Sequence, residues 1–187
     1  MISGVKDEMY TCLTVRCLVM TTRSENTVTI DQPVSKVHAA LCNADYWAFN
    51  VAHLSPEPGQ VHEFTAQDGG AEAVLYEVLP MDILPEAVRA MISQALKVKR
   101  VVKVAPLAED GSSSINYTAD VKGTPVDFQG DIAMSGDDSS TTLSYQNQID
   151  VKIPFMGPAI EPKVGEALGE LFNNEGALTD QWIKENL

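Results

Sequence analysis

Three polar residues of this sequence, Arg100, Tyr145 and Asn147, fall within runs that otherwise alternate apolar and polar residues. Successive side chains of a strand point to opposite faces, so an unbroken register places Arg100 on the apolar face of the run LKVKRVVKV. An inward arginine needs a partner, because an unpaired buried charge is very costly. One hypothesis is that Arg100 holds a ligand carboxylate or phosphate, with Tyr145 or Asn147 adding a hydrogen bond.

Two alternatives leave Arg100 without a ligand. In the first, a bulge in the strand turns the side chain outward to solvent. In the second, Arg100 pairs with an internal Asp or Glu. These alternatives are favoured over ligand binding, because strand register is fragile over a run of this kind.

Motifs of the common catalytic classes are absent from the sequence. It contains no Gly-x-Ser-x-Gly elbow, phosphate loop, Gly-x-Gly-x-x-Gly or His-Glu-x-x-His. The histidines His38, His53 and His62 lack the spacing of metal ligands. Cys42 lies close to His38 in the chain, but a small buried hydrophobe is the simpler interpretation of this cysteine than a nucleophile. We therefore expect no catalytic residue, no metal site and no cofactor.

The composition indicates one acidic globular domain. The chain has 187 residues, a hydrophobic fraction of 44% and a formal net charge of -13. A field of this sign repels nucleic acid and anionic lipid surfaces. The basic run around Lys97, Lys99 and Lys103 alternates as the solvated face of one strand would. No apolar run is long enough to span a membrane, so neither nucleic acid nor integral membrane association is expected.

The odd count of 3 cysteines predicts neither a disulfide framework nor a zinc site, and it favours a reducing cytoplasm. Residues 1–19 form a poor secretory signal, because charged residues precede and interrupt their apolar patch. Met20 stands directly before the first convincing strand. We expect residues 1–19 to be an extension, disordered or non-native, and residues 20–187 to form the domain. The oligomeric state does not follow from the sequence.

Hydrophobic periodicity predicts a strand, two short helices, about six further strands interrupted by one helix, and a long terminal helix. The Asp68-Gly69-Gly70 stretch is a strong hairpin signal. Consecutive strands with short turns favour an antiparallel meander, and hence an α+β fold with a curved sheet of about seven strands. The expected elements lie near residues 26–32, 33–42, 45–54, 61–67, 71–80, 84–96, 97–107, 115–121, 126–134, 141–153 and 157–187.

The terminal helix is the available cover for the apolar face of the sheet. Its apolar residues recur at helical spacing and form one stripe. Gly165 and Gly169 interrupt the helix four residues apart, which suits either a bend and ligand approach or close packing on the sheet. The expected stripe consists of Ile160, Val164, Leu168, Leu171, Phe172, Leu178 and Trp182.

The two ends of the chain carry a family resemblance. The stretch TIDQPVSKVHAALCNADYW resembles the opening of the START-like, or SRPBCC, helix-grip superfamily, which includes the birch-pollen-allergen-like proteins. The ending resembles that of an actinobacterial family known as domain of unknown function 2505, as does the inserted LPEAVRAMI segment. The resemblance covers roughly residues 22–187 and implies a helix-grip fold with a cavity, but no established activity. The matching positions at the end are Val151, Pro154, Gly157, Ile160, Glu161, Glu175 and Trp182.

In a helix-grip domain the ligand space lies between the concave sheet face and the last helix, and strand alternation nominates its lining. The inserted helix is a candidate lid, with Met91 and Ile92 dipping inward, or else a fixed part of the wall. Each nominated residue is equally consistent with a plain core. The pocket candidates are Arg100, Tyr117, Phe128, Ile132, Met134, Tyr145, Asn147, Met91, Val164 and Leu168.

Three functions fit this fold. The leading one is a non-enzymatic cytoplasmic protein that encloses a hydrophobic small molecule or lipid. The second is an enzyme that cyclises or dehydrates polyketide-like substrates, with Arg100, Tyr117 and Tyr145 as candidate pocket groups. The third is a chaperone-associated interaction module, which predicts a filled core and an exposed apolar patch.

Overall fold

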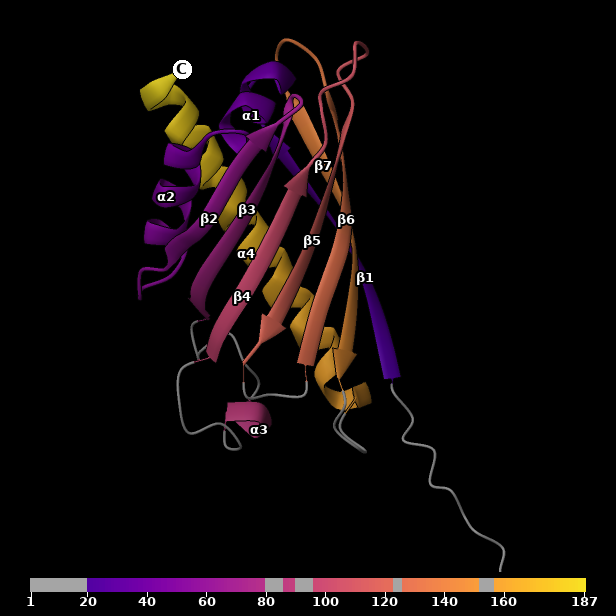
Figure 1. Cartoon of the computed structure of the whole chain (residues 1–187). Coiled ribbons are helices and arrows are strands. Elements are labelled where there is room, and N and C mark those ends of the chain that lie inside the picture. Colours follow the sequence, from indigo (N-terminus) through magenta and orange to yellow (C-terminus); the bar gives the residue numbers. More distant parts are fainter. Residues whose placement is uncertain (1–19, 80–85, 90–95, 123–125, 152–156) are drawn as a thin grey trace, which may run out of the picture.

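The computed structural model describes residues 20–79, 86–89, 96–122, 126–151 and 157–187 of the chain (Figure 1). Within this part, seven strands and four helices follow in the predicted order. They are β1 (Met20–Ile30), α1 (Val34–Leu41), α2 (Ala44–His53), β2 (Gln60–Gln67), β3 (Gly70–Leu79), α3 (Glu86–Arg89), β4 (Leu96–Val104), β5 (Ser113–Val121), β6 (Val126–Gly136), β7 (Thr141–Val151) and α4 (Gly157–Asn186).

All seven strands form one antiparallel sheet in the order β1-β7-β6-β5-β4-β3-β2. The meander runs from β2 to β7, and β1 returns to pair with β7, so the first and last strands are neighbours. Helix α4 crosses behind the curved sheet diagonally, and α1 and α2 lie beside its C-terminal half (Figure 1). The predicted α+β helix-grip architecture is confirmed.

The β2–β3 hairpin turns within the predicted Asp68-Gly69-Gly70 stretch, at Asp68 and Gly69. Asp68 has φ 52° and Gly69 has φ 78°, so both central residues are in the left-handed region. Two consecutive positive φ values define the type I′ turn, whose twist matches that of the flanking strands. Asp and Gly tolerate this conformation better than other residues, which explains why the turn could be predicted from this pair alone.

The buried stripe of α4 is centred on Phe172, Thr179, Trp182 and Ile183. This differs from the predicted stripe, since Leu168, Leu171 and Leu178 are only half-buried. The reason is the close approach of the helix at Gly176, where an added Cβ would lie 2.6 Å from Cγ1 of Val28 on β1. The helix therefore rests on β1 through a glycine, and the bulkier positions turn to its flanks.

Of the two glycines that interrupt α4, Gly165 and Gly169, the structure describes the surroundings of Gly169. An added Cβ at Gly169 would lie 3.1 Å from Nδ2 of Asn26, which supports close packing on the sheet at that position. The side chains of Ile160 and Val164, and the surroundings of Gly165, lie outside the described residues.

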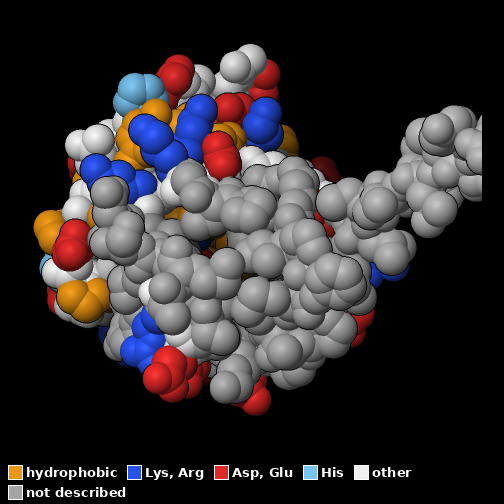
Figure 2. Space-filling view, turned by 90° about the horizontal axis from the view of Figure 1, so that it is seen from below, with side chains coloured by type: hydrophobic (Ala, Val, Ile, Leu, Met, Phe, Trp, Pro, Cys, Tyr) orange, Lys and Arg blue, Asp and Glu red, His pale blue; other side chains and the backbone are white. Residues whose placement is uncertain are grey.

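The outer face of the sheet carries the predicted basic residues. Lys97, Lys99 and Lys103 are all exposed on β4, and Lys103 pairs with Glu72 at 3.2 Å. Figure 2, which views the molecule from the end at which β4 begins, shows a group of Lys and Arg side chains there. This arrangement is that of a solvated strand face. No helix in the described part of the chain is long and apolar enough to cross a membrane.

Candidate functional site

Arg100 is the centre of the candidate site. Strand β4 keeps an unbroken register with both neighbours, so that Arg100 pairs with Leu75 of β3 and Ala119 of β5. The side chain points to the inner face together with Val98 and Val102, and only 9% of the residue is exposed. The bulge that would have turned Arg100 outward is absent, and the inward orientation predicted from the alternation is confirmed.

Two carboxylates hold the Arg100 guanidinium. Glu175 of α4 accepts from both terminal nitrogens, with Nη1 to Oε2 at 3.2 Å and Nη2 to Oε1 at 2.9 Å. Glu77 of β3 accepts from Nη2 at 2.8 Å, and Asn50 of α2 accepts from the same nitrogen at 3.4 Å. Arg100, Glu77, Glu175 and Asn50, here termed the Arg100 cluster, thus join four elements. The alternative in which Arg100 pairs with internal carboxylates is confirmed.

One donor of the cluster has no acceptor. The Nε atom of Arg100 is buried and finds no hydrogen-bond partner among the described residues. The guanidinium carbon of Arg100 lies 5.7 Å from the ring centroid of Trp47, so the cation also contacts an aromatic ring. Buried polar atoms are almost always paired, so an unpaired donor calls for a water molecule or a ligand atom.

The charges of the cluster act on one another. Burial alone would lower the pKa of Arg100, but Glu175 and Glu77 outweigh it and raise the pKa above its ordinary value, so Arg100 stays charged. Burial raises the pKa of Glu77; Arg100 opposes this rise and the charge of Glu175 adds to it. Glu77 therefore holds a proton more readily than an ordinary glutamate does.

Replacing Glu77 with glutamine is expected to change how stability depends on pH. A carboxyl whose pKa is raised by folding stabilises the fold fully below its unfolded-state pKa, about 4.3, and this contribution is lost as pH rises through the folded-state pKa. In E77Q the free energy of unfolding is expected to fall less as pH rises, because the amide stays neutral. Urea unfolding across this window tests it, with E72Q on the outer face of β3 as control. An unchanged pH profile in E77Q would contradict the assignment.

A chain of hydrogen bonds through Thr179 and Tyr46 connects two members of the Arg100 cluster, Glu175 on α4 and Asn50 on α2. Thr179 donates to the carbonyl of Glu175 at 2.8 Å, so its oxygen accepts from Tyr46 at 2.8 Å. Asn50 donates to the Tyr46 oxygen at 3.3 Å. Burial, followed by the charge of Glu175, raises the pKa of Tyr46 well above its ordinary value. Tyr46 therefore stays protonated and serves as a structural donor that ties α2 to α4.

A small cavity, here termed the inner cavity, lies between the sheet and α4 beside this cluster. Its volume is about 30 Å³, room for one water molecule. Phe172 fills much of the space, because its ring stacks on Tyr145 with centroids 4.1 Å apart and an interplanar angle of 18°. The wall of the inner cavity consists of Leu41, Tyr46, Trp47, Arg100, Val102, Ile115, Tyr117, Ile132, Leu143, Tyr145, Phe172, Glu175, Gly176 and Thr179.

Tyr145 is one of several residues of this wall that carry a polar group. Burial raises the pKa of Tyr145 well above its ordinary value, and the charge of Glu175 adds to the rise. Its hydroxyl therefore remains protonated. The wall of the inner cavity thus includes Arg100, whose Nε donor lacks an acceptor among the described residues, and Tyr145, whose hydroxyl is a neutral donor.

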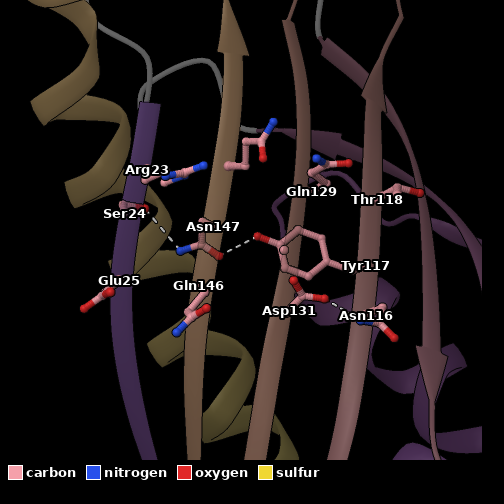
Figure 3. Close-up of a pocket in the computed structure, with 12 residues that line it drawn as sticks. Arg23, Ser24, Glu25, Asn116, Tyr117, Thr118, Gln129, Asp131, Gln146 and Asn147 are labelled. Atoms are coloured by element: carbon pink, nitrogen blue, oxygen red, sulfur yellow. Dashed lines mark hydrogen bonds between the residues drawn. The ribbon is translucent and has the colours of Figure 1, made fainter. Parts of the chain in front are cut away.

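A row of four facing residues spans β5, β6, β7 and β1. Tyr117 is paired with Gly130, Gly130 with Asn147, and Asn147 with Ser24. The Tyr117 ring lies across Gly130, where an added Cβ would be 2.5 Å from Cε1 of the ring. Tyr117 thereby reaches past β6 and donates to Asn147 at 2.7 Å, and Asn147 donates to Ser24 at 3.2 Å (Figure 3). Tyr117 and Asn147 therefore satisfy each other.

The remaining pocket candidates divide between wall and core. Ile132 is buried and lines the inner cavity. Met134 is buried in the core, and Phe128 and Leu168 are half-buried. Met91 and the side chain of Val164 lie outside the described residues, as does most of the predicted lid. Ligand contact stays a prediction for all of these positions.

The outer face of the sheet is also hollowed. A hollow of about 620 Å³ crosses β1, β7, β6 and β5 on the side away from α4 (Figure 3). Exposed side chains such as Arg23, Gln129, Asp131 and Gln146 line it, and they alternate along the strands with the buried inner residues. This polar surface is the hydrated face that an antiparallel sheet presents to water.

The structure brings Cys42 and His38 together. His38 Nε2 lies 2.9 Å from the carbonyl oxygen of Ala105, to which it donates. Sγ of Cys42 lies 3.9 Å from Nδ1 and 3.8 Å from Nε2, and Cys42 is half-buried instead of fully buried as expected. Burial raises the pKa of the Cys42 thiol, which keeps it protonated and weakens it as a nucleophile. That Cys42 has no catalytic role stays a prediction.

Sequence reasoning missed the two carboxylates as members of the site. Glu77 was detectable, since it follows Ala73 and Leu75 at the period of two that defines the inner face of β3. Glu175 lies three residues after Phe172 and four before Thr179, on the buried side of α4. A polar residue on an otherwise apolar face was the signal in both cases.

The curved antiparallel sheet and the long α4 that crosses it define a protein of the helix-grip class. A family model described as "Protein of unknown function (DUF2505)" matches residues 25–183. The chain belongs to this family, and the predicted resemblance is confirmed. It is 26% identical over 161 residues to uncharacterized proteins of Mycobacterium tuberculosis and Mycobacterium bovis, covering 82% of this chain and 92% of each relative.

Solved structures share the fold at low sequence identity. The Zhui aromatase/cyclase from a Streptomyces species has a TM-score of 0.57 at 11% identity, covering 89% of this chain and 95% of its own. Norcoclaurine synthase from Thalictrum flavum, in complex with dopamine and hydroxybenzaldehyde, has a TM-score of 0.53 at 10% identity, covering 100% and 96%. These neighbours are helix-grip proteins of the ligand-binding and cyclase type.

Proposed function

We propose that this protein binds a small, mainly apolar molecule between the inner face of its sheet and α4, next to the Arg100 cluster. The observation that carries the proposal is the unpaired Arg100 Nε, a buried donor on a residue that lines an otherwise largely apolar cavity. Ligand sites typically combine an apolar wall with a few oriented polar groups. A purely structural cluster pairs nearly all of its donors.

The volume of the inner cavity sets a condition on this proposal. About 30 Å³ accommodates one water molecule, whereas sites for drug-sized ligands measure roughly 300–1,000 Å³. A larger ligand therefore extends past the wall formed by the described residues, or it displaces the ring of Phe172. Burial of its apolar surface would supply the affinity, at roughly 25 cal/mol per Å² removed from water.

An interaction module is the less supported function. Such a module needs a contiguous apolar patch on its surface. The large hydrophobic residues exposed on the described surface are Tyr76, on β3, and Leu187, the last residue of the chain. Two such separate residues do not make a patch, so the described surface gives this alternative no support.

An enzyme is the second candidate, because the inner cavity has an ionisable wall. Arg100, Glu175, Tyr117 and Tyr145 all line it. Two structural neighbours carry enzyme names, an aromatase/cyclase and norcoclaurine synthase, and their shared fold makes the same class of chemistry worth testing here. Recovery of a bound compound unchanged after incubation would favour binding, and its conversion would favour catalysis.

Native mass spectrometry of protein purified without detergent, followed by organic extraction, tests the proposal. We expect a reproducible small-molecule adduct that is lost in I132W, because the added ring fills the inner cavity. A133W is the matched control, since Ala133 is the next residue of β6 and is exposed on the opposite face of the sheet. Equal adduct in both variants, with both folded, would overturn the proposed location.

A further inference from the structure

The charge balance of the Arg100 cluster restricts what the inner cavity can accept. The cluster contains one cation and two carboxylates, and the Arg100, Glu77 and Glu175 side chains are 11%, 11% and 13% exposed. Among the described residues, Arg100 is the sole ion-pair partner of Glu77 and Glu175. With both acids ionised the cluster carries one excess negative charge, and an incoming anion would add a second in a buried place.

A proton on Glu77 does not open the site to anions. Glu175 still engages both Nη atoms of Arg100, at 3.2 and 2.9 Å, in the paired geometry that a ligand carboxylate or phosphate would itself require. An anion would have to displace Glu175, which would leave that carboxylate buried without its partner. The original hypothesis that Arg100 holds a ligand carboxylate or phosphate is therefore not supported by this geometry.

The unpaired donor of Arg100 indicates the group that does fit. Arg100 Nε is buried without an acceptor among the described residues. Tyr145, whose protonated hydroxyl can also donate, lines the same cavity of about 30 Å³. A neutral oxygen supplies lone pairs to such donors without adding charge. A protonated amine has no lone pair to offer and would leave Arg100 Nε unpaired.

We infer that the site selects an uncharged molecule that presents a carbonyl or hydroxyl oxygen to Arg100 and Tyr145, and that it excludes carboxylates and phosphates. This inference rests on the proposed binding function and names its ligand class. Glu175 acts as the selective element, because its carboxylate already occupies the pair of Arg100 Nη atoms that would otherwise attract anions.

Three probes with the same apolar body test the inference: nonan-2-one, nonanoate and nonylamine, titrated at about pH 7.5. Trp47 lines the inner cavity, so quenching of tryptophan fluorescence reports occupancy. We expect the ketone to bind at least about tenfold more tightly than the other two. E175Q keeps an acceptor oxygen but removes one charge, so its affinity for nonanoate should rise relative to its affinity for the ketone. E170Q, on the exposed side of α4, is the matched control and should not change the order.

The outcomes separate the inference from the function on which it rests. Nonanoate binding as tightly as the ketone, or nonylamine binding most tightly, would overturn the ligand class while leaving the binding site in place. Failure of the folded protein to bind any of the three would instead count against the proposed function. Circular dichroism melting of E175Q and E170Q confirms that each variant is folded before it is titrated.

Discussion

Replacing Arg100 with methionine is expected to lower the free energy of unfolding by about 3–5 kcal/mol. Methionine fills a similar volume but cannot donate, so Glu77 and Glu175 would lose the cation that both contact within 3.0 Å. Two carboxylates would then face each other in a buried place. The loss should shrink as pH falls and the acids take up protons. Urea unfolding at neutral and acidic pH measures both effects.

The matched control for R100M is K99M, since Lys99 precedes Arg100 on β4 and is exposed on the outer face. Surface substitutions of this kind usually change stability by no more than about 0.5 kcal/mol. The triple variant R100M/E77Q/E175Q should recover most of the loss, because it removes the uncompensated charges together with the cation. A triple variant as unstable as R100M would show that the loss comes from packing instead of charge.

Replacing Phe172 with alanine is expected to lower the free energy of unfolding by about 3–5 kcal/mol. The side chain is 3% exposed and stacks on Tyr145, with Tyr117 edge-on at 6.2 Å between ring centroids. Its removal joins the ring's volume to the inner cavity and strips contacts from both tyrosines. Equilibrium unfolding in urea measures the loss.

The conservative variant F172L separates packing from other effects. Leucine keeps most of the volume, and such swaps usually cost less than about 1.5 kcal/mol. The F172A variant should also show the larger change in binding of nonan-2-one, because its enlarged cavity changes the wall beside Arg100. A loss below about 1 kcal/mol in F172A would mean that the ring is not packed between sheet and helix as described.

The fold was predictable from the sequence because its signals are local. The Asp68-Gly69 turn needs positive φ at both residues, and alternation along each strand assigns inner and outer faces without knowledge of the partner strand. The inward orientation of Arg100 followed from the same alternation. These features depend on residues within a few positions of one another.

The partners of Arg100 were not predictable in the same way. Glu77 lies 23 residues away and Glu175 lies 75 residues away, on a helix whose rotation about its own axis decides which side chains reach the sheet. That rotation depends on the contact of Gly176 with Val28, which only the packed structure reveals. The sequence therefore left open whether Arg100 meets a ligand or an internal acid.

The small volume of the inner cavity was equally hidden. Periodicity shows which residues face inward, but it does not show whether their side chains leave a space or fill it. Phe172 and Tyr145 were both expected on the inner surface, and their stacking at 4.1 Å closes much of the room between them. Cavity volume depends on such side-chain contacts between distant elements.

The Tyr117 ring and the absent side chain of Gly130 occupy one shared volume on neighbouring strands. The two positions should consequently vary together among members of the family. A tyrosine at 117 restricts position 130 to glycine, whereas a smaller residue at 117 frees position 130 to carry a side chain. Asn147, which accepts the hydroxyl hydrogen bond, should follow the same pattern. Family members in which these positions differ together should lack the contact of Tyr117 with Gly130 and its hydrogen bond to Asn147.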